Sequence, residues 1–417
     1  MRTRLGKTIL LPVLAVTAVA SPLAAADFSV PKLGVTPTCR GVEGHAAAFD
    51  GRRTFLLDPA ELTAIKAARD RDPAVRDAYT QLIARADAAL ARKPGSVMDK
   101  TTIPLSGDRH DYLSLAPYWW PDPARPDGPY VRRDGEVNPR RDTRAFDRTA
   151  LGRMSGDAAT LGLAYYYSDD PRYAAKAAAV IRTWFLDPAT RMNPNMTFAQ
   201  AVPGRENGRA EGVLDTSGFM GVIDAIGLIG PSAALSADEV RALESWFGRY
   251  LDWMQTSANG KEERAAKNNH GIWWDAQAMD FALFARRADV AAKVLAAFPK
   301  TRIAAQMDPS GALPAELART RSFHYSIFAL MPAYDVATLG TCLGFDLWRY
   351  TDDKGRGLRR ATDYLAPYRG RPAAWERKEL KWPAEELDVL LTRADAAWGP
   401  GAYPRASQGN ALLRYRR

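Results

Sequence analysis

Residues 236–256 read SADEVRALESWFGRYLDWMQT, the clearest helix signal in this chain of 417 residues. Ser236 followed by Glu239 forms a capping box, in which two side chains cap backbone N–H groups of the first helical turn. The apolar residues that follow recur every three or four positions, as on one helix face: Leu243, Trp246, Phe247, Tyr250, Leu251 and Met254. The stretch therefore predicts an amphipathic helix with one buried face.

Similar helix signals are spread along the chain, whereas strand signals are scarce. Asp58-Pro59 and Asp170-Pro171 each place an N-cap before a proline in the first turn of a helix. Residues 276–298 and 384–397 are also helical by composition and spacing. Alternating amphipathic helices predict an all-α fold, a toroid or solenoid of helical hairpins. No low-complexity linker divides the chain, so residues 27–417 are predicted to form a single domain.

The first 26 residues have the three parts of a secretory signal peptide. Arg2, Arg4 and Lys7 precede the apolar stretch 9–20, and the small residues 24–26 offer a cleavage site. A membrane anchor is the alternative, but the apolar stretch is short for a span. No second stretch of this kind follows, so we expect a periplasmic or secreted protein without a membrane span.

Composition and charge narrow the class of partner. Hydrophobic residues make up 47% and charged residues 25% of the chain, which is typical of a globular protein and excludes disorder, collagen and coiled coil. The net charge is +9, leaving +6 without the three basic side chains of residues 1–26. A mildly basic exported protein suits a polyanionic ligand, although charge for solubility explains the value equally well. Nucleic acid is not expected, because no dense Lys/Arg run occurs.

Two long segments lack helical periodicity. Residues 101–141 hold seven prolines and five Tyr or Trp residues. Such a loop inside a compact domain is usually functional, and a structural belt over helix ends is the alternative. Residues 191–212, which include Arg205 and Asn207, predict a second loop beside a cleft.

Several kinds of catalytic site are missing from the sequence. No G-x-S-x-G elbow, phosphate loop, dinucleotide fingerprint or H-E-x-x-H motif occurs. Only four histidines are present, so no metal site and no cofactor are predicted. The paired carboxylates of a glycoside hydrolase remain an alternative, since Asp and Glu are plentiful. Cys39 and Cys342 are either one disulfide or two buried thiols.

Two polar clusters carry the functional prediction. Residues 267–275 read KNNHGIWWD, two amides and an imidazole ahead of paired indoles. The second cluster consists of Glu316, Arg319, Arg321, Ser322, His324 and Tyr325. Structural alternatives are an N-cap at Asn268 with a core histidine at 270, and a solvated Arg/Glu face with a core tyrosine. Arg319 and Tyr325 share no helix face, so they converge only if the segment bends.

These clusters resemble the active-site pattern of the alginate lyase superfamily, which includes polysaccharide lyase families 5 and 38. The resemblance rests on Asn269-His270-Gly-Ile-Trp-Trp and on Arg319 and Tyr325 six residues apart. HDYLSLAPYWWPDP (110–123) and ELDVLL (386–391) are similar to further parts of this family. The resemblance implies an incomplete (α/α) toroid or barrel of helical hairpins. The six-residue spacing of Arg319 and Tyr325 favours a family 38-like branch, whose substrates resemble mannuronan and glucuronan. Gly271 follows the Asn-His pair where the family 5 motif has a tyrosine, which also favours that branch.

The resemblance implies metal-independent β-elimination on 4-linked uronic acid polymers, in which C5 loses a proton and the C4–O bond breaks. Asn269 and Arg319 would neutralise the substrate carboxylate. His270 would be the base or its assistant, and Tyr325 the acid. Where the C5 proton and O4 lie on one side of the sugar, Tyr325 would be both acid and base, with its pKa lowered by Arg319 or Arg321.

Further residues and alternatives complete the prediction. Substrate binding is predicted for Tyr118, Trp119, Arg205, Asn207 and Arg321. The partner is an anionic polysaccharide. A glycoside hydrolase on a helical toroid and a non-catalytic uronan-binding protein are the two competing functions.

Overall fold

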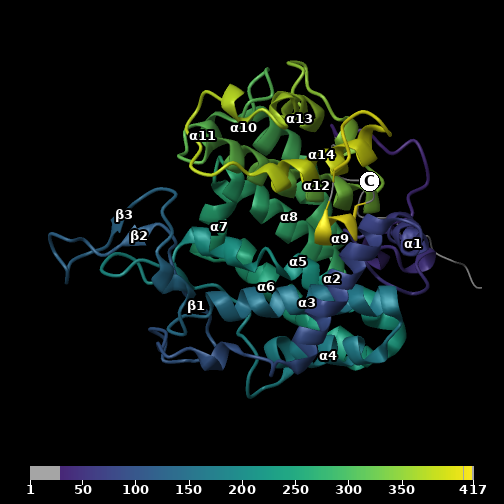
Figure 1. Ribbon diagram of the computed structural model, residues 1–417. Coiled ribbons are helices and arrows are strands. Elements are labelled where there is room, and N and C mark those ends of the chain that lie inside the picture. Colours follow the sequence, from purple (N-terminus) through teal and green to yellow (C-terminus); the bar gives the residue numbers. More distant parts are fainter. Residues whose placement is uncertain (1–28, 407, 416–417) are drawn as a thin grey trace, which may run out of the picture.

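The computed structural model describes residues 29–406 and 408–415, and most of them lie in helices (Figure 1). The predicted mostly helical class is therefore confirmed. The α-helices are α1 (Pro59–Ala68), α2 (Pro73–Ala91), α3 (Arg148–Ser168), α4 (Pro171–Ile181), α5 (Phe219–Ile229), α6 (Ala237–Thr256), α7 (Ala258–Ala265), α8 (Asn269–Phe284), α9 (Ala288–Phe298), α10 (Ala304–Gln306), α11 (Pro314–Leu317), α12 (Ser322–Cys342), α13 (Leu358–Leu365), α14 (Ala384–Trp398) and α15 (Gly409–Leu412). The predicted signal peptide, residues 1–26, lies outside the described residues.

The four short strands fall in the two segments without helical periodicity. β1 (Leu113–Leu115) runs parallel to β4 (Phe198–Ala201), which ties the two segments together. β2 (Trp119–Trp120) pairs antiparallel with β3 (Val131–Arg132). Figure 1 shows β2 and β3 standing out from the side of the helical body. We call residues 117–138, which hold this hairpin, the β2–β3 lobe.

The predicted helix starts are confirmed by their caps. The Asp58 carboxylate accepts hydrogen bonds from the backbone N–H groups of residues 60 and 61, and the Asp170 carboxylate accepts one from residue 172. Both halves of the capping box between Ser236 and Glu239 are present at the start of α6. These caps are local interactions, so a short stretch of sequence is enough to predict them.

The prediction of one helix over residues 276–298 was wrong. α8 ends at Phe284 and α9 begins at Ala288, and Arg286 between them has a left-handed backbone with φ 61°. The Arg286 guanidinium pairs with Glu43 and Glu244, which lie far away in the sequence. The residues around the break favour a helix, so no local sequence signal predicts it. The ion pairs of Arg286 with Glu43 and Glu244 are what stabilise it.

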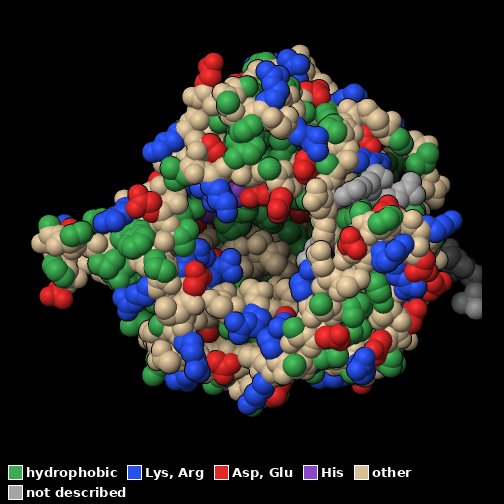
Figure 2. Space-filling model, in the orientation of Figure 1, with side chains coloured by type: hydrophobic (Ala, Val, Ile, Leu, Met, Phe, Trp, Pro, Cys, Tyr) green, Lys and Arg blue, Asp and Glu red, His purple; other side chains and the backbone are tan. Residues whose placement is uncertain are grey.

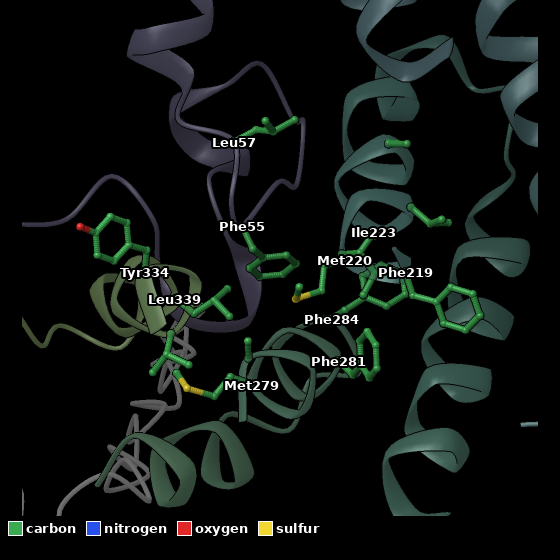
Figure 3. Close-up of a cluster of buried hydrophobic side chains, with 14 of the residues drawn as sticks. Phe55, Leu57, Phe219, Met220, Ile223, Met279, Phe281, Phe284, Tyr334 and Leu339 are labelled. Carbon is green, nitrogen blue, oxygen red and sulfur yellow. The ribbon is translucent and has the colours of Figure 1, made fainter. Parts of the chain in front are cut away.

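The core surrounds α8, which is buried along nearly its whole length and contacts α6, α9 and α12. Figure 3 shows Phe281 and Met279 of α8 meeting Phe219 of α5 and Leu339 of α12. The buried residues of α8 include the polar Asp275, Gln277 and Asp280 as well as apolar ones, so neighbouring elements cover it on all sides. The N-terminal end of this central helix carries Asn269 and His270, and the core therefore holds that end in place.

Two further features concern the whole chain. Cys39 and Cys342 form a disulfide with Cα atoms 4.5 Å apart, which settles the alternative left open by the sequence. Within the described part of the chain, residues Ala210–Ser232 are the one helical stretch long and apolar enough to cross a membrane. Because 78% of that apolar window is buried inside the molecule, it has the character of a core helix.

Candidate active site

A cavity of about 670 Å³ lies at the N-terminal end of α8. Its wall brings together all four predicted catalytic residues and two of the predicted substrate-binding residues: Asn269, His270, Arg319, Tyr325, Tyr118 and Trp119. They come from α8, from α12 with the turn before it, and from the β2–β3 lobe. The face shown in Figure 2 is deeply hollowed, with Lys and Arg side chains around the hollow.

The His270 imidazole is oriented by a buried carboxylate. Its Nδ1 lies 2.7 Å from Oε1 of Glu263, a residue of α7 that is 2% exposed. An ionised carboxylate only accepts hydrogen bonds, so Nδ1 carries the hydrogen and Nε2 of the neutral ring keeps its lone pair. Burial is the largest single effect and lowers the pKa of His270, but Glu263, together with Glu211 and Glu316, outweighs it and the net shift is upward. The side chain is 17% exposed, which leaves the ring accessible from the cavity.

Asn269 is held by a second buried carboxylate, Glu316 of α11. The Asn269 backbone N–H lies 2.5 Å from Glu316 Oε1, and its Nδ2 lies 2.9 Å from Oε2. Nδ2 has two hydrogens, so one remains for a ligand in the cavity. Oδ1 of Asn269 is buried without a hydrogen-bond partner among the described residues. The amide is therefore fixed in position and only partly satisfied.

Arg319 lies over the ring of Tyr325. Its guanidinium carbon is 3.8 Å from the ring centroid, because the chain bends between α11 and α12 and brings the two residues together. Asp134 of the β2–β3 lobe accepts from Nε at 3.2 Å and from Nη2 at 2.8 Å. Thr320 also donates its hydroxyl to Asp134, at 3.0 Å. The lobe is thereby attached to the turn that carries Arg319.

The Tyr325 hydroxyl lies 2.5 Å from that of Tyr118 on the β2–β3 lobe. Burial and Tyr118 raise the pKa of Tyr325, and Arg319 offsets only part of this rise. Arg319 lowers this pKa as expected, but burial and Tyr118 raise it by more, so the net shift is upward. A phenol with a raised pKa stays protonated near neutral pH, which suits a proton donor.

Arginines form a cationic wall of the same cavity. Arg141, Arg148 and Arg209 line it, and the Nε atom of each is buried without a hydrogen-bond partner in the described residues. Gln200, another wall residue, has a left-handed backbone with φ 50°, held by Ser114, Glu211 and Asp215. These guanidinium groups are partly used by neighbouring side chains, since Arg209 donates to Glu211 and Gln200, and Nε of Arg148 lies 3.8 Å from Oδ1 of Asp215. A strained polar residue beside partly satisfied guanidinium groups is typical of a surface that binds a ligand.

Three predicted substrate-binding residues do not line this cavity. Arg205 donates from Nε to the Tyr130 carbonyl at 2.7 Å and packs its guanidinium over Trp119. Asn207 is exposed on the surface. Arg321 is the N-cap residue of α12, with its Nε 3.9 Å from Glu379. A role in binding sugars outside the cavity remains a prediction for these three.

Known proteins resemble this chain in both sequence and fold. Residues 96–375 match the alginate lyase family. The chain belongs to the alginate lyase family. A solved alginate lyase from Bacteroides ovatus is 39% identical, with a TM-score of 0.83 over 87% of this chain and 99% of that one. A variant of alginate lyase A1-III complexed with a tetrasaccharide has a TM-score of 0.55 at 16% identity, over 88% of this chain and 98% of that one, and shows a common fold. No curated protein matches the chain.

This member of the alginate lyase family is a polysaccharide lyase. The sequence did not assign roles to the residues that hold its site: Asp134, Glu263, Glu316, Arg141, Arg148 and Arg209. Asp134 and Glu316 lie 185 and 47 residues from the residues that they hold, whereas Glu263 lies only seven residues from His270 but on the other side of the bend between α7 and α8. Arg141 and Arg209 lie within the two segments without helical periodicity, and this position was the one sequence feature that indicated a place near the site. The described residues contain no group of three or more His, Cys, Asp or Glu able to hold a metal ion.

Proposed function

We propose that this lyase cleaves 4-linked uronic acid polymers, such as alginate or glucuronan, by β-elimination. The observation that carries the proposal is the meeting of an oriented imidazole, a protonated phenol and anion-binding groups in one open cavity. Base, acid and carboxylate binding are the three functions that the elimination requires.

Proton removal from C5 falls to His270. Glu263 holds its Nδ1, so Nε2 is the free lone pair and accepts the C5 proton. Glu263 also stabilises the imidazolium that forms, since the two charges are opposite and buried. The electron pair of the C5–H bond then forms the C4=C5 double bond, and the C4–O4 bond breaks.

Proton delivery to the leaving O4 falls to Tyr325. An alkoxide leaving group is strongly basic, so a phenol that is still protonated is a suitable acid. Guluronate places the C5 proton and O4 on opposite faces, which needs two separate groups. Mannuronate and glucuronate place them on one side, where Tyr325 would act as base and acid. The raised pKa of Tyr325 supports the assignment with two separate groups, in which His270 is the base and Tyr325 is the acid.

Neutralisation of the substrate carboxylate falls to Asn269 and Arg319. The second hydrogen of Asn269 Nδ2 and the Nη1 of Arg319 make no hydrogen bond with the described residues, since Glu316 and Asp134 occupy the other positions. Asn269 borders the cavity but is 0% exposed, so its amide would contact the carboxylate of a sugar that enters fully. A carboxylate held in this way gains less charge when C5 is deprotonated. Arg141, Arg148 and Arg209 would bind the carboxylates of neighbouring sugars.

Two wider expectations belong to the same proposal. The disulfide between Cys39 and Cys342 supports export to an oxidising compartment, the periplasm or the medium. The mostly helical architecture supports an incomplete (α/α) toroid.

A substrate panel tests the reaction. The protein is incubated with mannuronan, guluronan, glucuronan and hyaluronan, and new ultraviolet absorbance from unsaturated uronic ends is followed. We expect absorbance with at least one of the first three polymers. Reducing ends without a double bond would identify a glycoside hydrolase instead. Retention of the protein by a polymer in affinity electrophoresis, without depolymerisation, would identify a binding protein.

A further inference from the structure

A second cavity, of about 600 Å³, is lined in part by the same segment of chain as the first, residues 141–149. It is formed by the residues after α2, by the connection that leads into α3, and by α3 and α4. Nothing in the proposed elimination uses it.

Cations outnumber carboxylates in this second cavity. Lys100 is neutralised by Asp147 at 3.1 Å, and Arg92 is paired with Asp157. Lys93, Arg144 and Arg153 also line the cavity, and their exposed side chains make no ion pair with the described residues. Six basic and four acidic side chains line it in total: Arg92, Lys93, Lys100, Arg144, Arg153 and Lys176 against Asp99, Asp142, Asp147 and Asp157. The cavity therefore keeps unneutralised positive charge that favours an anion.

The inner wall of this cavity is apolar. Phe146, Met154, Val180 and Trp184 line it, and each is at most 9% exposed. Charged groups at the edge and buried apolar groups behind them are typical of a site for an organic ligand rather than for a simple ion. A sugar acid matches both features, because its carboxylate suits the cations and the apolar C–H face of its ring suits the apolar wall.

One stretch of chain lines both cavities. Arg141 and Arg148 line the active cavity, whereas Asp142, Arg144 and Thr149 line the second one. The segment 141–149 therefore contributes arginines to both cavities.

We propose that the second cavity is a distal binding site for the uronan chain, in which Lys93, Arg144 and Arg153 hold carboxylates of sugars remote from the cleaved bond. The inference rests on the proposed function, because it takes the same polymer as its ligand. The site strengthens binding of long chains and takes no part in the elimination itself.

The test compares two triple variants with the same loss of charge. Lys93→Ser/Arg144→Ser/Arg153→Ser removes the three cations of the second cavity. Lys300→Ser/Lys354→Ser/Arg371→Ser removes three exposed cations that make no ion pair with the described residues and line neither cavity. KM and kcat are measured for the best polymer of the panel and for its tetrasaccharide, and the thermal melting of each variant is recorded.

We expect the first variant to raise KM for the polymer about fivefold to tenfold with kcat unchanged, since each exposed cation contributes roughly 0.2–1 kcal/mol. KM for the tetrasaccharide should stay within about twofold of the wild-type value. In the control variant, KM for the polymer and KM for the tetrasaccharide should both stay within the same range. A polymer KM equal to that of the control would overturn the proposal.

A binding measurement separates this proposal from the proposed function. Calorimetric titration of each variant with the polymers of the panel gives affinities that do not depend on turnover. If no polymer is cleaved but the first triple variant binds one of them more weakly than the control, the elimination fails and the distal site stands. Equal affinities of the two variants, or no binding of any uronan, would remove the distal site.

Discussion

At the scale of single residues, Glu263 determines how His270 can act. The carboxylate is buried and lies on a different helix from the imidazole that it orients. It holds the ring by one nitrogen and raises its pKa against the effect of burial. Both effects are needed if Nε2 is to accept a proton and the resulting imidazolium is to be stabilised.

Glu263→Gln should move the acidic limb of the profile of kcat/KM against pH to lower pH. His270 acts as a base only when deprotonated, and its net raised pKa keeps it protonated to higher pH in the wild-type protein. Removal of the Glu263 carboxylate leaves only Glu211 and Glu316 to oppose burial, so the pKa of His270 should fall. Glu262→Gln is the matched control, because Glu262 also lines the cavity but is exposed and has no bond to His270. Coincident acidic limbs in the two variants would exclude His270 as the base.

Asp134→Asn should destabilise the protein by about 2 kcal/mol near neutral pH. Although burial raises the pKa of Asp134, its bonds to Arg319 and Thr320 outweigh burial and lower it to about 2. The folded-state pKa lies below the unfolded value of 3.8, so the stabilisation is complete above about pH 4 and is lost as pH falls toward 2.

Thermal melting of wild type and Asp134→Asn across this pH range measures the effect. Asp127→Asn serves as control, since Asp127 is exposed on the same lobe and makes no ion pair with the described residues. The melting temperatures of the wild-type and Asp134→Asn proteins should converge at the acidic end. A constant difference at all pH values would show that the carboxylate charge is not what stabilises the lobe.

At the scale of elements, the N-terminal end of α8 is packed too closely for any side chain at Gly271. A Cβ atom there would lie 2.3 Å from the Ala266 carbonyl oxygen and 2.4 Å from Nη1 of Arg302. Arg302 is 5% exposed and bonded to Asp275 of α8 at 2.7 Å. This packing fixes the helix end that presents Asn269 and His270 to the cavity.

Gly271→Ala should lower the free energy of unfolding by roughly 1–3 kcal/mol and reduce activity, because Arg302 must move. Gly156→Ala in α3 provides the contrast. A Cβ there meets nothing within 4 Å, so the better helix propensity of alanine should leave stability equal or raise it by up to about 1 kcal/mol. Denaturant unfolding of both variants checks the difference, and a Gly271→Ala protein as stable as Gly156→Ala would refute the close packing.

Sequence predicts these elements to the extent that their signals are local. The caps at Asp58, Asp170 and Ser236 lie within three residues of the groups that they bond, and all three helix starts were predicted. The break between α8 and α9 was missed, because Glu43 and Glu244 stabilise it from elsewhere in the chain. The same reason explains why Glu316 received no role, since it lies 47 residues from Asn269. Glu263 is only seven residues from His270, but the bend between α7 and α8 that brings the two together was not predicted.

At the scale of the whole molecule, one disulfide joins the segment before α1 to the C-terminal end of α12. Cys39 precedes α1 and Cys342 ends α12, 303 residues later. A long closed loop restricts the unfolded chain strongly, so the bond stabilises the folded state. From sequence the pairing could not be decided, because the distance between two remote cysteines is a property of the complete fold.

Cys39→Ala/Cys342→Ala should lower the free energy of unfolding by about 2–5 kcal/mol. Thermal melting with and without a reductant gives the measurement. The reductant should lower the melting temperature of the wild-type protein and leave that of the double variant unchanged. Equal melting of wild type in both conditions would contradict a stabilising disulfide.

The central claim is that Tyr325 donates the proton that completes the elimination. The most direct measurement is the rate of new ultraviolet absorbance with Tyr325→Phe on the best polymer of the panel, with Tyr364→Phe as a matched variant outside the cavity. We predict a loss of at least about 10²-fold for the first and an unchanged rate for the second, since a general acid contributes 10²–10⁴-fold. Equal rates in the two variants would contradict the mechanism.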